Sequence, residues 1–190
     1  IISMHNLIKS IKQLSKENFP NDKVYELLNN SYLKETEIAD YIKYDNDKYT
    51  RHLIYKDVDF EILIMCWKPG HKAPIHGHEG EKCFMRVEKG SLLFTNYNLI
   101  STSPLDLQKI DSIKGEVGYL DGPADIHSVE NIYNENSITF HIYSKPYKEC
   151  DIFDVKTGLI YRKKLEYDTV FKKQRKYNYC LLYTSPSPRD

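Results

Sequence analysis

Two histidines separated by one residue, His76 and His78, are the first candidates for chemistry in the chain. In an extended strand alternate side chains point to the same face, so the two imidazoles would lie about 7 Å apart and could converge on one metal ion. A His-x-His pair in a strand is also commonly two partly exposed residues without a metal. The pair alone therefore leaves both interpretations open.

The segment after this pair predicts a turn followed by a strand. Glu79-Gly80-Glu81 has the composition of a turn, which changes the register of the chain before Cys83. With that change, Cys83 and the alternate residues after it would line the inside of the fold. Arg86 and Glu88 would then face water.

A second chemical pattern lies in the segment from Ser137 to Tyr147. Alternation places Ile138 and Phe140 on one face of a strand, and it places Thr139, His141 and Tyr143 together on the other. Polar side chains on a buried strand need partners, which a hydrogen-bonded row of these three residues would supply.

Composition bounds the class of protein. The chain has 190 residues, of which 41% are hydrophobic, and this predicts one soluble domain. The 27 basic and 27 acidic residues balance, so we expect no nucleic-acid partner and no anionic membrane, but a small neutral or zwitterionic ligand. No apolar run is long enough to span a bilayer and no signal peptide is recognisable, so we expect a cytoplasmic protein, and a monomer.

The cysteines and the two ends of the chain need separate treatment. Four cysteines without paired spacing argue against a disulfide framework and against a structural zinc site. Residues 180–190 resemble a translated sequencing adapter, and residues 1–3 resemble upstream read-through, so both are left out of the expected fold. Cys180 would then not belong to the natural protein.

Helices are expected first in the chain. Apolar residues from Leu7 to Leu14 recur at three- and four-residue steps and predict a first helix, and Phe19-Pro20 stops this pattern. A second short helix should follow a cap at Asn21 or Asp22, and a third should span Glu35 to Tyr44.

Strands follow once the apolar period changes to two. Tyr49 to Tyr55 and Asp59 to Trp67 are the first, and the second of these, apolar on both faces, should be central in its sheet. The later expected elements are a strand from Leu92 to Tyr97, an irregular stretch to Ile110, strands at Gly115 to Leu120 and Ile126 to Ile132 around the turn Asp121-Gly122-Pro123, and a strand or hairpin within Leu159 to Lys173.

Several of these segments together resemble one protein family. The frame Gly70-x5-His76-x-His78-x4-Cys83-x6-Gly90 resembles the first motif of the cupin superfamily, with Cys in the place of the usual Glu, which is a mark of thiol dioxygenases and of the cysteine dioxygenase family. The segment His127 to Asn131 resembles the second cupin motif. Tyr49-Thr50-Arg51, the row at 139, 141 and 143 with Thr in place of Ser, and Cys150 to Asp154 also match this family.

The resemblance implies a fold and a domain layout. The fold would be dominated by β-structure, a cupin-type β-barrel or jelly roll with N-terminal helices packed outside. The order of helices and then many short strands supports this independently. A single domain would span 4–179, with the helices at about 4–44 and the barrel at about 49–173.

The resemblance also implies a site and an activity. His76, His78 and His127 would bind Fe(II), and Arg51 with Tyr49 would bind the substrate carboxylate. Tyr143, Cys83 and His141 would be catalytic, with His141 orienting Tyr143 and a thioether joining Cys83 to Tyr143. The protein would oxidise L-cysteine with O2 to cysteine sulfinic acid, a step of cysteine catabolism and of taurine biosynthesis.

Two positions depart from the family pattern. Asp125 stands where Gly is usual, two residues before His127, and this changes the local turn. Lys145 stands where Pro is frequent, so the peptide bond after Ser144 is expected to be trans on the base rate for residues other than proline.

Alternative functions remain at this point. A related dioxygenase could act on cysteamine or 3-mercaptopropionate, but Arg51 argues against both, because cysteamine has no carboxylate and the 3-mercaptopropionate enzymes lack this Arg. A non-catalytic metal-binding cupin would explain three histidines but not the combination of Arg51, Cys83 and Tyr143.

Overall fold

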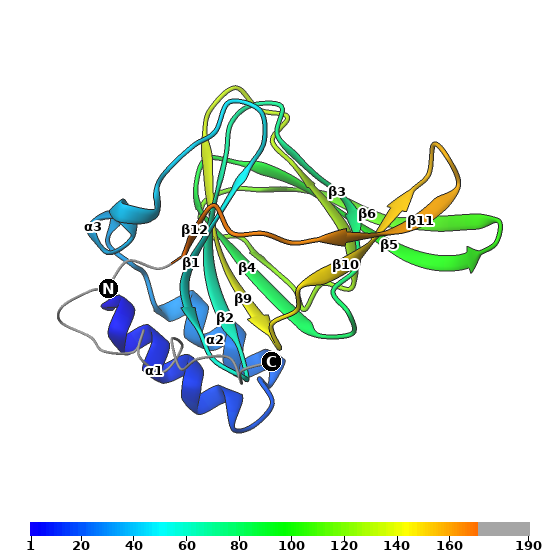
Figure 1. Ribbon diagram of the computed structural model, residues 1–190. Coiled ribbons are helices and arrows are strands. Elements are labelled where there is room, and N and C mark those ends of the chain that lie inside the picture. Colours follow the sequence, from blue (N-terminus) through cyan, green and yellow to red (C-terminus); the bar gives the residue numbers. More distant parts are fainter. Residues whose placement is uncertain (171–190) are drawn as a thin grey trace, which may run out of the picture.

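The computed structural model describes residues 1–170 as two layers of strands with helices on one outer face (Figure 1). The helices precede the strands, as the sequence predicts. The elements are α1 (Met4–Ser15), α2 (Asn21–Asn30), α3 (Glu35–Ile38), the 3-10 helix η1 (Ala39–Tyr41), β1 (Thr50–Lys56), β2 (Glu61–Trp67), β3 (Lys72–His76), β4 (Lys82–Lys89), β5 (Leu92–Thr102), β6 (Leu105–Gly115), β7 (Leu120–Asp121), β8 (Ile126–Glu130), β9 (Ser137–Ser144), β10 (Glu149–Asp154), β11 (Leu159–Lys164) and β12 (Thr169–Val170).

Two six-stranded sheets enclose the interior of the barrel. The first has the order β12-β1-β2-β9-β4-β7 and the second the order β11-β10-β3-β8-β5-β6. Strand β12 runs parallel to β1, whereas the other neighbours in the first sheet are antiparallel. The expected β-barrel with helices outside is therefore confirmed.

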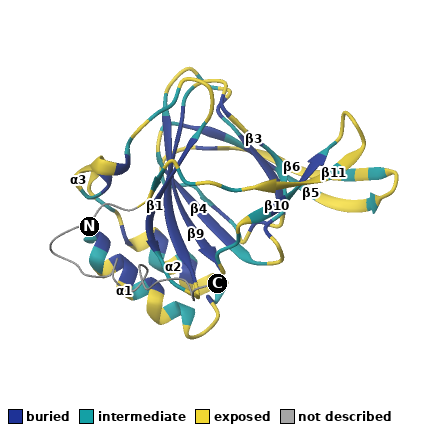
Figure 2. Cartoon of the chain, in the orientation of Figure 1, coloured by how far each residue is buried: buried dark blue, intermediate teal, exposed yellow. Residues whose placement is uncertain are grey.

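Strand β2 is buried along its whole length because both of its faces are covered (Figure 2). Ile62 and Ile64 pack outward against the apolar stripe of the helices, which includes Leu7. Leu63 and Met65 point inward and pack between the sheets. This explains the continuous apolar run in the sequence, and β2 does lie centrally, between β1 and β9.

The first two helices are present as predicted, but the cap predicted at Asn21 or Asp22 is wrong, because α2 begins at Asn21 with Pro20 as its N-cap and no side-chain cap. The third helix is shorter than predicted. The helical segment ends with η1 at Tyr41 instead of reaching Tyr44. The backbone beyond it bonds to strand β1 instead of continuing the helix. The Lys43 carbonyl accepts hydrogen bonds from the side chains of Thr50 (2.6 Å) and His52 (3.0 Å). No helix among residues 1–170 is long and apolar enough to span a bilayer.

The segment after Leu92 differs most from the expectation. The predicted irregular stretch before Ile110 is instead part of a long hairpin of β5 and β6, which projects from the barrel (Figure 1). Strand β6 is exposed on nearly every residue, so its sequence lacks the alternation that marks a half-buried strand. The strand predicted from Gly115 to Leu120 is also wrong, because Gly115 ends β6 and the chain turns before β7 begins at Leu120.

Arg86 was expected to face water, and this expectation is wrong. Its side chain is 1% exposed and donates from Nη1 to the carbonyl of Leu28, within the last turn of α2, and to the carbonyl of Ser31, just beyond it. Its Nε also donates to the half-buried Glu88 at 2.7 Å. The reason is that the outer face of β4 lies under α2, so water does not reach it.

The bond between Ser144 and Lys145 is cis, contrary to the expected trans geometry. The Lys145 amide donates to Glu81 Oε2 at 3.0 Å, at the end of the β4 and β9 pair where Lys82 lies opposite Ser144. The expectation rested on a general frequency, which carries no information about this position. Residues 171–190, with Cys180 and the adapter-like tail, lie outside the described residues.

Candidate metal centre and substrate pocket

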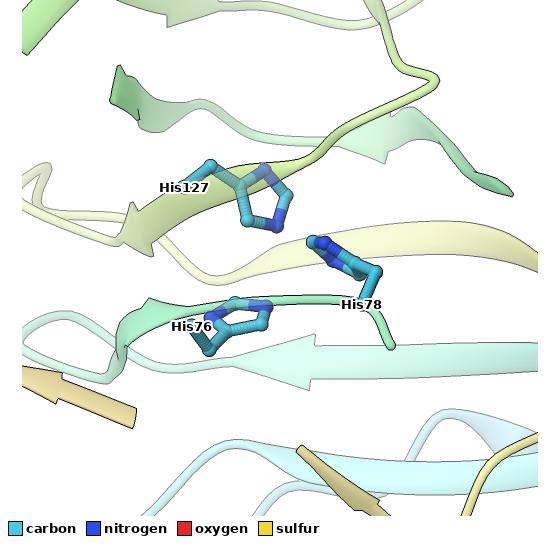
Figure 3. Close-up of side chains that lie close together, drawn as sticks. All are labelled: His76, His78 and His127. Atoms are coloured by element: carbon cyan, nitrogen blue, oxygen red, sulfur yellow. The ribbon is translucent and has the colours of Figure 1, made fainter. Parts of the chain in front are cut away.

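Three histidines from two segments meet inside the barrel (Figure 3). His76 ends β3, His78 follows it by two residues, and His127 lies on β8, where it is the direct cross-strand partner of His76. One nitrogen from each of the three rings lies within 4.8 Å of the others. The ring centroids are separated by 4.7 to 4.9 Å.

The turn predicted after His78 is present and reverses the direction of the chain. Glu79 and Gly80 both have positive φ angles, of 56° and 74°, so the chain reverses before β4 begins. Gly80 suits this backbone conformation, which L side chains rarely adopt.

Each of the three imidazoles is held at Nδ1 by an oxygen that can only accept. The partners are the Pro74 carbonyl for His76 (2.6 Å), the Asp125 carbonyl for His78 (2.6 Å) and Asp121 Oδ2 for His127 (3.0 Å). Each Nδ1 must therefore carry the proton, which leaves the Nε2 lone pair for a metal.

The protonation of the rings agrees with a ligand role. Burial and the neighbouring imidazoles lower the pKa of His76 far below its usual value, and burial with His127 lowers the pKa of His78 to about 3. Neutral imidazole is the form that binds metal. The buried Nε2 of His78 also has no hydrogen-bond partner within residues 1–170. The residues present thus fit a divalent metal ion.

The segment from Asp121 to Asp125 supplies the Nδ1 partners of two of these rings. It includes the turn Asp121-Gly122-Pro123 that the sequence predicts. Tyr25 of α2 donates a hydrogen bond to the Gly122 carbonyl. Asp125, which replaces the usual Gly, contributes its backbone carbonyl rather than its carboxylate. The helical layer is therefore in contact with the segment that orients the metal ligands.

Cys83 and Tyr143 are direct cross-strand partners in the β4 and β9 pair. Both are buried, with exposures of 1% and 6%. Burial raises the pKa of the Cys83 thiol, and burial with Cys83 raises the pKa of Tyr143 far above its usual value. Both groups are therefore held in their neutral forms.

The predicted polar row on β9 is present and is longer than expected. Trp67 Nε1 donates to Thr139 Oγ1 at 2.9 Å, and Thr139 Oγ1 lies 2.7 Å from His141 Nε2. His141 Nδ1 lies 3.4 Å from the Tyr143 hydroxyl. Because Trp67 can only donate, the Thr139 proton is available to His141 Nε2, and His141 Nδ1 then donates toward Tyr143.

This direction leaves the Tyr143 proton free to point into the pocket. Burial and Arg51 lower the pKa of His141 well below its usual value, so His141 is neutral and has one donor and one acceptor nitrogen. Trp67 had no place in the sequence-based site, because a buried Trp in a central strand looks like ordinary core.

Arg51 and Tyr49 line the same pocket as His76 and His127. The pocket is bounded by metal-site, aromatic and apolar residues: Tyr49, Arg51, Met65, Trp67, Ala73, Pro74, His76, His127, Val129, His141, Tyr143, Tyr147, Cys150, Ile152, Lys163 and Leu165. Tyr49 stacks on Trp67 with ring centroids 4.4 Å apart. Arg51 is 7% exposed and donates from Nη1 to the Glu166 carbonyl at 2.9 Å.

Tyr147 is a pocket residue that the sequence analysis did not identify. Its ring packs edge-on against Tyr143 at 5.6 Å and against His78 at 6.4 Å. It lies just after the cis bond in a segment without regular structure, so no periodicity could reveal its direction. The described thiols of Cys66, Cys83 and Cys150 are all free and buried.

A β-barrel that holds three inward-facing imidazoles beside a pocket has the fold and the site of a metal-dependent cupin enzyme. The chain belongs to the cysteine dioxygenase type I family, whose family model matches residues 2–156. The members of this family are cupin thiol dioxygenases, which act on a small molecule with O2.

Individual relatives agree with this assignment. The Homo sapiens protein named cysteine dioxygenase type 1 is 29% identical over 162 residues, which cover 82% of this chain and 81% of that protein. The Danio rerio relative of the same name is 28% identical over 166 residues, with the same coverage of 82% and 81%. The Rattus norvegicus relative is 31% identical over 127 residues, or 64% of each chain.

Proposed function

We propose that the chain oxidises L-cysteine with O2 to cysteine sulfinic acid at an Fe(II) ion held by His76, His78 and His127. Both oxygen atoms of O2 are transferred to the sulfur, so the thiol R–SH becomes R–SO2H and no further reductant is needed. Family membership and the uniform Nδ1 bonding of the three imidazoles support the proposal.

The observation that carries the choice of substrate is the position of Arg51. Its guanidinium is buried and lines the pocket shared with two of the metal-site histidines. A guanidinium binds a planar carboxylate with two parallel hydrogen bonds. A thiol that carries a carboxylate, as L-cysteine does, would be held with its sulfur toward the histidines and its carboxylate on Arg51. Cysteamine has no carboxylate for this contact.

The surrounding residues would orient the substrate and hold protons. When bound, the metal ion would supply the redox chemistry and would favour the thiolate form of the substrate. Tyr49 would border the carboxylate beside Arg51. Tyr143, whose proton is free to point into the pocket, would donate a hydrogen bond there, and His141 would orient its hydroxyl.

A thioether between Cys83 and Tyr143 is a second part of the proposal. Its formation joins the sulfur to a ring carbon and removes two hydrogen atoms, with O2 as the oxidant. The cross-strand register of the two residues supports it. We further propose that the protein is a cytoplasmic monomer, that residues 4–179 form its single domain, and that it acts in cysteine catabolism and taurine biosynthesis.

Metal analysis together with an oxygen-consumption assay tests the proposed function. The purified protein should contain iron and should consume O2 in amounts equal to the L-cysteine oxidised, with cysteine sulfinic acid as the product. Cysteamine and 3-mercaptopropionate should be poor substrates under the same conditions. Faster turnover of either compound, or no oxygen uptake with any thiol after reconstitution with Fe(II), would contradict the proposal.

A further inference from the structure

The residues from Glu166 to Asp168 make a run of contacts with Arg51 that the proposed function does not yet use. The Arg51 amide donates to Asp168 Oδ2 at 2.8 Å, and the Asp168 amide donates to the Arg51 carbonyl at 2.8 Å. The Glu166 carbonyl accepts from Arg51 Nη1 at 2.9 Å. The backbone of Arg51 is thus bound by Asp168 and its side chain by Glu166.

Tyr167, between these two residues, lies against the guanidinium itself. The guanidinium carbon is 5.4 Å from the centroid of the Tyr167 ring, within the range of a cation–π contact. The Tyr167 side chain is only half-buried, yet its hydroxyl donates a hydrogen bond to Glu61. Lys56 Nζ also lies 3.4 Å from the same hydroxyl.

Glu61, which accepts the hydrogen bond from the Tyr167 hydroxyl, is a buried residue of the first sheet. It is 1% exposed, begins the central strand β2 and is the cross-strand partner of Tyr143. A carboxylate is rarely placed on the inside of a barrel unless it is paired, because burial of an unpaired charge is costly. Tyr167 links Glu61 to Arg51, because its hydroxyl donates to Glu61 and its ring contacts the Arg51 guanidinium.

We propose that Tyr167, anchored on Glu61, is a positioning residue that holds the Arg51 guanidinium ready for the substrate carboxylate. The inference rests on the proposed role of Arg51 and extends it to the segment that follows β11. A long, flexible side chain loses rotamer freedom when it binds a ligand, and a side chain that is already held in place loses less. The Tyr167 ring and the Glu166 carbonyl together restrict the guanidinium to one orientation.

The geometry leaves donors for the substrate. A guanidinium has five N–H donors, and the described contacts of its head use one of them, at Nη1. The contact with Tyr167 is a cation–π contact over its ring and not a hydrogen bond to an N–H group, so it leaves the remaining donors unused. Loss of the ring should therefore weaken carboxylate binding without changing the chemistry at sulfur.

The test compares Tyr167→Leu with Tyr167→Phe and with Tyr161→Leu, a matched control. Tyr161 lies on neighbouring β11 and is 50% exposed. For each metal-loaded variant the measurements are KM and kcat for L-cysteine, the inhibition constant of cysteamine as a competitor, and the iron content. Tyr167→Phe keeps the ring and removes the hydroxyl with its bonds to Glu61 and Lys56, and it serves as the second variant where the leucine protein is unstable.

We expect Tyr167→Leu to raise KM for L-cysteine about tenfold with kcat within about twofold. Tyr167→Phe should raise KM by a smaller factor, about threefold, because the ring stays but loses its anchor. The inhibition constant of cysteamine and the iron content should not change, and Tyr161→Leu should behave as the native protein does.

Three results would overturn the inference. One is an unchanged KM in both Tyr167 variants, and another is an equal loss of L-cysteine and cysteamine binding. The third is a fall in kcat alone. If Arg51→Ala impairs L-cysteine turnover while both Tyr167 variants are normal, only this inference fails. If Arg51→Ala is also without effect, the proposed function fails with it.

Discussion

Asp121 and His127 form a buried pair in which a carboxylate oxygen accepts the Nδ1 proton of a metal-site imidazole at 3.0 Å. Both side chains are almost fully buried, with exposures of 7% and 3%. A carboxylate behind a ligating histidine fixes its tautomer and increases its basicity. Of the three imidazoles, His127 has a carboxylate as its described Nδ1 partner, whereas His76 and His78 have carbonyls.

We therefore expect Asp121→Asn to weaken metal binding by about 10- to 100-fold, because the amide oxygen keeps the hydrogen bond but loses the charge. Competition with a chelator measures the affinity directly. Asp111→Asn is a suitable control, since Asp111 is exposed and bonds only to Asn96 among its described partners. Equal metal affinity in the Asp121→Asn and native proteins would mean that the pair is merely structural.

Replacement of His76, His78 or His127 by Ala should strip most of the iron from the protein, because each removes one of the three available lone pairs. Metal content after purification is the measurement. His71→Gln provides the control, as His71 is also buried but has Lys68 and Asn46 as partners. The assignment fails if all three alanine variants keep iron at the native stoichiometry.

Arg51→Ala should lower kcat/KM for L-cysteine by a factor of tens to about a thousand, or ~2 to 4 kcal/mol, because the substrate carboxylate would be buried without its partner. Arg51→Lys should recover part of the loss, since an ammonium group cannot reproduce the guanidinium fork. Steady-state oxygen uptake gives both values. Cysteamine turnover should change little, and a native rate of L-cysteine oxidation in Arg51→Ala would exclude the carboxylate role.

The register of Cys83 and Tyr143 predicts a mixture of linked and unlinked protein in preparations exposed to O2 and iron. The linked form should be lighter by two hydrogen atoms and should migrate differently on a denaturing gel. Cys83→Ser should show the unlinked form alone. Cys66→Ser, which changes a free thiol on the helix side of β2, should leave the mixture intact. A single native mass in every preparation would contradict the link.

The buried histidines predict a loss of stability in acid for the metal-free protein. Burial lowers the pKa of His78 to about 3 and also lowers the pKa of His52 below 6.5. Below the unfolded pKa the unfolded chain binds protons that the folded chain does not, so the free energy of unfolding decreases as pH falls. The stabilisation by each neutral histidine is complete above its pKa in the unfolded chain, and it is lost as the pH falls toward its pKa in the folded protein.

Urea unfolding of the metal-free protein between about pH 7 and pH 5 measures this slope, which is at most ~1.4 kcal/mol per pH unit for each histidine. His52→Gln removes one titrating group away from the metal centre and should flatten the profile. Parallel profiles for the variant and the native protein would show that His52 does not contribute.

Much of the site follows from local sequence patterns. The alternation of β9 predicts the row of Thr139, His141 and Tyr143, and the two-residue spacing of His76 and His78 predicts their common face. The two histidines meet although β3 ends at His76 and His78 lies beyond it. The row on β9 depends only on the geometry of a single strand. The bond from Trp67 to Thr139 does not, because it joins β2 to β9 and depends on their register.

The features that sequence analysis missed are contacts between distant segments. The Asp121 carboxylate looks like part of a polar turn, and Arg86 looks like a solvent-facing charge, until the helices are placed over β4. Likewise Glu166 to Asp168 have no pattern of their own, and their importance comes from lying beside Arg51. The end of β5 beyond Tyr97 and the strand β6 were missed because most of the β6 residues are exposed, so burial imposes little pattern on them.

Arg86 also affects how the protein unfolds, because it joins the end of α2 to β4. The last carbonyls of a helix have no partner within the helix and are usually satisfied by its own following residues or by water. Here a guanidinium from the sheet fills that role for Leu28, and it binds Ser31 as well. The end of α2 and the middle of β4 therefore share hydrogen bonds that neither can replace alone, so fraying of the helix and opening of the sheet are one cooperative event.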